Sequence, residues 1–257
     1  MGVNGSWASS GRIDTSYKMK RKGPLRFLFT KAENVSEINT HDHDGSIAVS
    51  PDGQKLYIYR YSDMWQATVN ETGKWTKPKR MHESIDGKSS HEPSMCLSPD
   101  GNTLYFVSDR PGGQGGKDIY RAEKRSEGNW GLPVNLGPNV NTPYDEESPY
   151  VAAANSMLYF SSEGHNSMGG FDIFKSPNEN GQWMKPENMG YPINNGGDDL
   201  FFVPCSANDK CGYYASMQHN TLGDLDIYAI AQIEQSHRMY VRVSEGSKPV
   251  SDARIWY

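Results

Sequence analysis

The sequence predicts an all-β fold, a β-propeller with four clear blades and a fifth, irregular blade. The main observation is internal repetition, because Leu104-Tyr105-Phe106 recurs as Leu158-Tyr159-Phe160, and Asp118-Ile119-Tyr120 recurs at the same spacing as Asp172-Ile173-Phe174. A period of about 40 to 55 residues is typical of propellers, in which each repeat forms one blade. Composition agrees: the chain has 26 glycines, 15 prolines and 11% aromatic residues, as expected for many short strands joined by turns.

One repeat, residues 92–141, illustrates the expected strands. SMCLS is a short strand, and PDGN is a turn in which Pro and Asp begin the reversal and Gly takes the left-handed conformation. TLYFVSD and DIYRAEK, rich in β-forming residues, are the second and third strands. A Gly-x-Trp pair in SEGNW follows a further turn. Short antiparallel strands in sequential order describe a propeller blade.

Further signals define the units and the irregular blade. Each unit opens with an acidic residue: Asp44, Glu92, Glu146 and Asp199. NVSEINT at 34–40 resembles the end of another repeat, and PLRFLFT at 24–30 reads as one of its strands. Because a propeller closes on itself to remove sheet edges, we expect the first and last elements to share a blade.

The glycine-rich segment at 110–118, RPGGQGGKD, is compared with a phosphate-binding loop. Such a loop needs G-x-x-x-x-G-K-[ST] between a strand and a helix. Here Pro111 stands at the first glycine position, Asp118 replaces Ser/Thr, and a strand-like segment follows. The glycines suit a hairpin turn, where a positive φ carries little steric cost. We therefore expect no nucleotide site.

Two residue types recur at the repeat period and are expected to be architectural. The tryptophans of the Gly-x-Trp pairs would pack between blades, because each buries a large apolar area. The aspartates that open the third strands would accept hydrogen bonds from nearby backbone N–H groups. These residues are Trp75, Trp130, Trp183, Asp63, Asp118, Asp172 and Asp226.

The acidic residues that open the units allow two interpretations. Each precedes an innermost strand, so together they could ring one mouth of the central channel and bind a cation or a basic peptide. Alternatively, each carboxylate caps a turn. The candidate binding residues are Asp44, Glu92, Glu146 and Asp199.

The three cysteines bear on the cellular compartment of the protein. Cys205 and Cys211 bracket SANDK, where two other repeats have SPDG. A disulfide across that hairpin is geometrically plausible and would favour an oxidising compartment such as the periplasm. Two free thiols are the alternative. Cys96 is expected to be a small buried residue, and without C-x-x-C spacing no zinc site is predicted.

Charge and hydropathy exclude other classes. A net charge of −5 with both signs interspersed argues against a nucleic-acid binder. The sequence contains no run of 18 apolar residues, the length that a membrane-spanning helix needs, so no membrane span is predicted. The first five residues lack the apolar core of a secretory signal.

Motifs of enzymes and metal sites match poorly. NETGKW, SEGNW and NENGQW echo the S-x-D-x-G-x-T-W boxes of sialidase propellers, but the Asp and Thr are missing and no arginine recurs at the period. GHNSMGG contains no G-x-S-x-G elbow of a serine peptidase. In HDHDG, His41 and His43 form a usable pair of metal ligands, although such pairs in polar loops more often bind no metal. We expect no catalytic residue, metal or cofactor.

Taken together, the motifs resemble a known family. SPDGNTLYFVSDRPGGQGGKDIY and PVNLGPNVNTPYDEESPYV look like WD40-like repeats of the TolB type, in the long-period variant of periplasmic OmpA-family proteins. The motifs also resemble those of PorE-like envelope proteins of the type IX secretion system. The resemblance covers about residues 34–230. The first repeat departs by lacking the glycine-rich loop, and the third has AAANS for SPDG.

The resemblance implies a domain organisation. Residues 1–23 are an N-terminal segment that is flexible or part of the closing blade, and residues 24–235 are the propeller. Residues 236–257, which include KPVSDARI, look like the start of a truncated carboxypeptidase-regulatory-like β-sandwich. Peptidoglycan binding would require an OmpA-like domain that this chain does not include.

The function expected is a non-enzymatic protein-interaction scaffold. A propeller offers a rigid face with variable loops, although fold alone does not fix function. The resemblance implies a periplasmic, outer-membrane-associated protein with envelope proteins as partners and, more specifically, a component of the type IX secretion system. The alternative is a glycan- or ion-binding, lectin-like propeller that uses the acidic ring and HDHDG.

Overall fold

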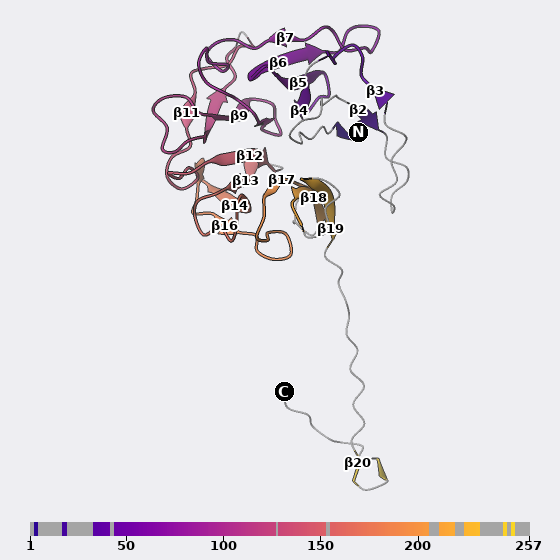
Figure 1. The fold of residues 1–257 in the computed structure, drawn as a ribbon, viewed down its shortest axis with the longest axis vertical. Helices are drawn as coiled ribbons and strands as arrows, with labels where there is room; N and C mark the ends of the chain where they lie inside the picture. The colour runs from indigo at the N-terminus through magenta and orange to yellow at the C-terminus, as the bar shows by residue number, and fades with distance from the viewer. Residues whose placement is uncertain are drawn as a thin grey trace.

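The computed structural model shows four antiparallel sheets arranged around a common centre (Figure 1). The described part of the chain contains no α-helix, and none of it forms a helix with the length and apolar character to cross a membrane. The structure describes residues 33–41, 44–126, 128–152, 155–205, 211–218 and 224–231, and the backbone of 3–4, 17–19, 244–245 and 248–249.

Each predicted repeat forms one blade whose strands pair in sequential order. Blade 1 is β4 (Gly45–Val49), β5 (Lys55–Arg60), β6 (Asp63–Thr68) and β7 (Lys79–Arg80). Blade 2 is β8 (Met95–Leu97), β9 (Thr103–Ser108), β10 (Asp118–Glu123) and β11 (Val134–Asn135). Blade 3 is β12 (Glu146–Val151), β13 (Met157–Ser162), β14 (Asp172–Glu179), β15 (Gln182–Trp183) and β16 (Glu187–Asn188). Blade 4 is β17 (Asp199–Pro204), β18 (Cys211–Ser216) and β19 (Asp226–Ala231).

The first strand of each blade lies nearest the centre. β4 contacts β8, β8 contacts β12, and β12 contacts β17, so successive inner strands adjoin one another. The β-propeller fold and its four clear blades, which the repeats predicted, are therefore confirmed. One detail differs, because the exit segments of blades 2 and 3 supply outer strands, β11 and β16. The Gly-x-Trp segment forms only an isolated bridge in blades 1 and 2, at Trp75 and Trp130, and forms the short strand β15 in blade 3.

A fifth sheet contains the N-terminal strands β1 (Val3–Asn4), β2 (Tyr17–Met19) and β3 (Glu33–Asn34). These strands pair in the order β1-β2-β3, and β1 contacts β4 of blade 1. Within the described residues this sheet and blade 4 are separate, and β3 pairs with β2, its local neighbour. The expectation that the first and last elements share a blade stays a prediction. PLRFLFT lies outside the described residues.

The last described elements are two antiparallel strands of two residues each, β20 (Ser244–Glu245) and β21 (Lys248–Pro249). They lie in the segment for which the resemblance implies a sandwich, and two short strands do not distinguish that domain from another. The sandwich stays a prediction.

The turns explain the recurring SPDG motif. Gly53 and Gly101 have φ of +70° and +71°, a left-handed conformation that favours glycine. Asp52 accepts a hydrogen bond from the Gln54 backbone N–H at 2.9 Å, which closes an Asx turn between the first two strands. The motif therefore fixes the hairpin of the blade.

The hydrophobic core lies between neighbouring blades. Trp183 of blade 3 is 5% exposed and meets Tyr105 of blade 2 edge-on, with ring centroids 6.0 Å apart. Trp130 of blade 2 packs on a cluster that includes Tyr57 and Ile85. Trp75 packs against blade 1 residues and against Val35 and Ile38 of the segment that follows β3. The tryptophans therefore join adjacent sheets, as aromatic groups of this size do in cores.

Candidate functional site

The four acidic residues that open the blades are fully buried. Asp44, Glu92, Glu146 and Asp199 are each 0% exposed. Their side chains therefore do not face solvent at the mouth of a channel, and their role as binding residues stays a prediction. The physical reason for their burial is local: each carboxylate is used to satisfy polar groups of its own blade and the segment before it.

Hydrogen bonds show this architectural role. Glu146 accepts from the Thr142 backbone N–H at 3.0 Å, the Thr142 hydroxyl at 2.7 Å and the Ser162 hydroxyl at 2.8 Å. Asp199 accepts from the Asn195 backbone N–H at 2.7 Å and from the Ser216 hydroxyl. Such carboxylates tie the exit segment to the end of the second strand.

Blades 1 and 2 add a cation to the same arrangement. Asp44 forms an ion pair with Arg60, whose side chain is 7% exposed. Glu92 lies 3.3 Å from the Arg110 guanidinium and accepts from the Ser108 hydroxyl at 2.7 Å. The buried carboxylates of blades 3 and 4 receive no such partner among the described residues.

The buried carboxyl groups of blades 3 and 4, which lack a cationic partner among the described residues, have raised pKa values. Desolvation by burial raises the pKa of Glu146 to about 7 and that of Asp199 to about 6. Burial also raises the pKa of Glu92, although its hydroxyl partners and Arg110 act in the opposite direction. Buried carboxyl groups favour the neutral form in this way.

We expect the stability of the protein to fall as pH rises from 5 to 8. The folded-state pKa of Glu146 lies above its unfolded value, so its contribution is fully present below about pH 4 and is lost as pH rises through about 7. The expected loss of unfolding free energy is about 3 kcal/mol. Urea unfolding at several pH values measures it.

The matched variants for this prediction are Glu146→Gln and Glu163→Gln. Glu163 is an exposed residue that follows the second strand of the same blade, so its replacement should leave the pH dependence unchanged. Glu146→Gln should flatten it. An unaltered slope in Glu146→Gln would show that this carboxyl group does not titrate as the structure implies.

The aspartates that open the third strands also serve local structure. Asp118 accepts from the Gly115 backbone N–H at 3.1 Å and from the Asn135 side-chain amide at 2.8 Å. Asp172 likewise accepts from the Met168 backbone N–H at 2.7 Å. Blade 1 differs, because Asp63 lies 2.7 Å from the guanidinium of Arg80. Asp226 of blade 4 opens β19 and is also partnered.

The glycine-rich loop of blade 2 is shaped by the next blade. A Cβ on Gly115 would lie 2.1 Å from the Tyr144 carbonyl oxygen, and one on Gly116 would lie 2.1 Å from Asp145 Oδ1. Within the loop Gly112 has a positive φ of 94°. Gly115 and Gly116 are therefore required mainly because the loop approaches blade 3 closely, and less because of turn conformation. The segment that follows the loop is strand β10.

An aromatic pair recurs in blades 2, 3 and 4, which sequence analysis did not single out. The pairs are Phe106–Tyr120, Phe160–Phe174 and Tyr214–Tyr228, with ring centroids 6.0, 5.8 and 5.7 Å apart. Each pair joins the second and third strands. The signal was available, since both positions recur at the repeat period.

In blades 2 and 3 a side chain from the following turn covers the aromatic pair. The Arg110 guanidinium lies 4.8 Å and 5.2 Å from the two ring centroids and donates to the Ile85 carbonyl. The His165 ring lies 5.9 Å and 5.2 Å from its pair, and its Nε2 is 3.0 Å from the Val140 carbonyl. These side chains bridge to the exit segment of the preceding blade.

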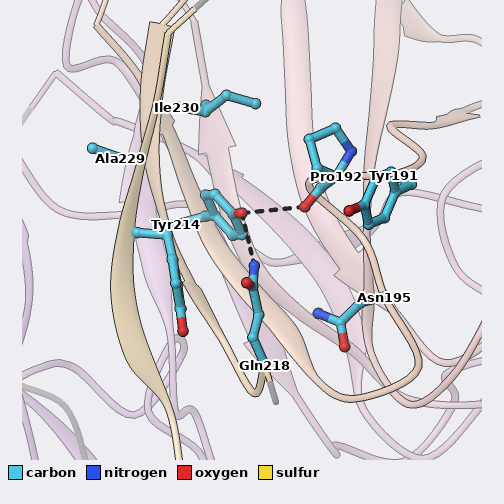
Figure 2. Close-up of a pocket in the computed structure, with 8 residues that line it drawn as sticks. Tyr191, Pro192, Asn195, Tyr214, Gln218, Ala229 and Ile230 are labelled. Carbon is cyan, nitrogen blue, oxygen red and sulfur yellow. Dashed lines mark hydrogen bonds between the residues drawn. The ribbon is translucent and has the colours of Figure 1, made fainter. Parts of the chain in front are cut away.

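Blade 4 instead has an open pocket of about 450 Å³ at this position. Figure 2 shows the Tyr214 hydroxyl donating to the Pro192 carbonyl at 3.3 Å and accepting from the Gln218 amide at 3.2 Å. The pocket lies between the exit segment of blade 3 and strands β18 and β19. Its principal residues are Tyr191, Pro192, Asn195, Tyr214, Gln218 and Tyr228. It is the candidate functional site.

The remaining predicted residues lie elsewhere. A disulfide joins Cys205 to Cys211, with Cα atoms 5.4 Å apart, and Cys96 is buried as a free thiol. Burial raises the pKa of the Cys96 thiol to about 12. His43 of the HDHDG pair lies outside the described residues. Within those residues, no group of three or more His, Cys, Asp or Glu side chains could hold a metal ion.

Known structures share this architecture. TolB of Acinetobacter baumannii is 14% identical with a TM-score of 0.53, over 84% of this chain and 46% of that chain. A TolB of Agrobacterium tumefaciens is 16% identical with a TM-score of 0.51, over 78% of this chain and 62% of that chain. The chain therefore shares the β-propeller fold of these two TolB structures. The chain spans about half to three fifths of the length of these TolB proteins. No protein-family model matches the sequence, and no curated protein matches it.

The expectation that the chain is not an enzyme is corrected by the same comparison. A puromycin hydrolase is 15% identical with a TM-score of 0.44, over 72% of this chain and 26% of that chain. The periplasmic gluconolactonase of Pseudomonas aeruginosa is 13% identical with a TM-score of 0.44, over 91% of this chain and 69% of that chain. Enzymes are thus among the matches, so the propeller gives no ground for excluding catalysis. These likenesses assign no reaction to this chain.

Proposed function

We propose that this propeller is a protein-interaction scaffold of the bacterial periplasm. The observation that carries the proposal is the open pocket in blade 4, whose lining includes the exposed Tyr191, in a blade that also exposes two further large apolar side chains. Tyr191 is 85% exposed, Ile227 is 56% exposed and Met217 is 40% exposed. Aromatic residues and methionine are enriched in protein interfaces, and a rigid propeller holds them in fixed positions.

Two features support the periplasmic location. The fold is shared with TolB structures, and a disulfide between Cys205 and Cys211 suits an oxidising compartment. The finer proposal is association with the outer membrane, envelope proteins as partners and a place in the type IX secretion system. That proposal is supported by the resemblance of the repeat motifs to PorE-like proteins. Peptidoglycan contact would come through another domain.

Site-specific cross-linking tests the scaffold. The photoreactive residue p-benzoylphenylalanine replaces Tyr191 in one preparation and Tyr144, which is 60% exposed in the entry loop of blade 3, in the other. Both are irradiated with periplasmic extract. We expect one envelope protein to cross-link at position 191 and not at position 144. The captured protein is then purified and its Kd measured with the unmodified chain and with Tyr191→Ala, which should bind at least tenfold more weakly.

Two results would contradict this function. One is equal cross-linking at both positions, which would indicate non-specific contact. The other is retention of a glycan on an array, lost in Tyr191→Ala, with no protein cross-linked. That result would establish the lectin-like alternative at the same pocket.

A further inference from the structure

The aromatic pairs of blades 2 and 3 are covered by nitrogen-bearing side chains of the chain itself. Arg110 contacts both rings of its pair, the Ile85 carbonyl and the buried Glu92 carboxylate. His165 contacts both rings of its pair and the Val140 carbonyl. The three elements of the arrangement are therefore an aromatic face, an exit-segment carbonyl and a planar nitrogen donor.

Blade 1 repeats the arrangement with different residues. The Arg60 guanidinium lies 5.4 Å from the centroid of Trp65, donates to the Ile38 carbonyl and pairs with the buried Asp44. A planar cation can stack on a ring and donate in its own plane at once, which a compact ammonium group cannot do as well. Two of the three filled positions accordingly hold arginine.

Blade 4 has the aromatic face and the carbonyl but a neutral side chain at the arginine position. Ser108 precedes Arg110 by two residues, and the equivalent Ser216 precedes Gln218 by two. The Gln218 amide donates to the Tyr214 hydroxyl at 3.2 Å, beside the pocket of about 450 Å³. Among the described residues, none fills the volume that a guanidinium fills in blade 2.

The charges of blade 4 also favour a cationic group in the pocket. Asp199, the blade 4 equivalent of Glu92, is 0% exposed and accepts hydrogen bonds only from neutral groups among the described residues, namely Asn195 and Ser216. Glu92 and Asp44 each have an arginine partner. A buried carboxylate without a cationic partner favours the arrival of a positive charge.

We propose that the blade 4 pocket binds the guanidinium group of an arginine side chain presented by a partner protein. The guanidinium stacks on the Tyr214–Tyr228 pair, donates to the Pro192 carbonyl and lies beside Asn195, whose side-chain amide donates to Asp199 at 2.8 Å. This inference rests on the proposed scaffold function and names the chemistry of the partner residue. Arginine is enriched in interfaces and is often a dominant contributor to binding.

The test uses a small probe and its neutral isostere. N-acetyl-arginine amide and N-acetyl-citrulline amide are titrated into the full chain, and binding is measured by calorimetry and by NMR of tyrosine resonances. Citrulline has nearly the shape of arginine but no charge. We expect saturable arginine binding in the millimolar range and at least tenfold weaker citrulline binding, since a single side chain offers few contacts.

Gln218→Arg provides an internal replica of blade 2. This variant should fill the pocket, abolish binding of the arginine probe and raise Tm. Gln54→Arg is the matched control, because Gln54 is exposed in the hairpin turn of blade 1. It adds the same charge and should leave binding unchanged.

Three outcomes would overturn the inference: equal binding of both probes, no binding of either, or binding that survives in Gln218→Arg. A His219→Ala variant completes the test, because His219 is the repeat equivalent of His165 in the sequence. Binding seen only in His219→Ala would show that the chain supplies its own occupant, and would overturn the inference for the natural sequence. A protein captured at Tyr191 despite failure of the arginine probe would leave the scaffold function standing and refute only this ligand.

Discussion

Replacing Trp183 with alanine is expected to destabilise the protein by about 3–5 kcal/mol. The indole is 5% exposed and belongs to the cluster that joins blades 2 and 3. Its edge-to-face contact with Tyr105 would be lost, whereas the hydrogen bond of 2.9 Å from the Asn139 amide to the backbone carbonyl of residue 183 would remain. The substitution leaves a cavity between the sheets of blades 2 and 3, and neither sheet can move to fill it without disturbing its own strand pairing. Urea unfolding followed by circular dichroism measures the change.

Leu132→Ala serves as the control for the tryptophan variant. Leu132 is 74% exposed, so removing this large apolar side chain should change stability by no more than about 0.5 kcal/mol. Trp183→Phe should cost less than Trp183→Ala because an aromatic ring remains. Equal stability of Trp183→Ala and Leu132→Ala would mean that the blades do not depend on this contact.

Replacing Arg60 with methionine is expected to cost about 3–5 kcal/mol. Methionine keeps much of the apolar volume, so the loss reports mainly on electrostatics. Arg60 is the cationic partner of Asp44, which is 0% exposed and would remain as a buried charge without compensation. The variant also loses the hydrogen bond to the Ile38 carbonyl, which ties β5 to the segment following β3. Urea unfolding measures the loss.

Two further variants separate charge burial from packing. Lys88→Met removes a surface ion pair with Glu83, in which the two side chains are 83% and 65% exposed, and should change stability by less than about 1 kcal/mol. The double variant Asp44→Asn, Arg60→Met should recover part of the loss, because the unpaired buried charge is gone. A double variant less stable than Arg60→Met alone would contradict this explanation.

Several fold features followed from sequence alone. The recurrence of Leu-Tyr-Phe and Asp-Ile-aromatic segments at a constant period defined the second and third strands of the blades, and SPDG marked the hairpins between the first two strands. These patterns are local, since each depends on side-chain alternation and on the φ that glycine permits. The order in which strands pair also follows, because sequential antiparallel strands need only short turns.

The pairing of the outermost strands did not follow. Val134–Asn135 joins β10 in the sheet of blade 2, whereas Trp130 forms only a bridge. Both segments are short and have turn residues around them, so no hydrophobic alternation distinguishes them. The separation of the N-terminal sheet from blade 4 was likewise beyond local patterns, because closure depends on contacts between residues far apart in sequence.

The candidate site divides in the same way. The sequence by itself determined the repeat, the hairpin turns and the positions of the aromatic pairs, because these follow from periodicity and backbone conformation. Only the tertiary structure decided that Asp44, Glu92, Glu146 and Asp199 are buried, and that Arg110 and His165 cover their pairs while Gln218 leaves a pocket. The burial of these carboxylates and the presence of the pocket depend on how one blade packs against the next, and the sequence of a single repeat does not determine that packing.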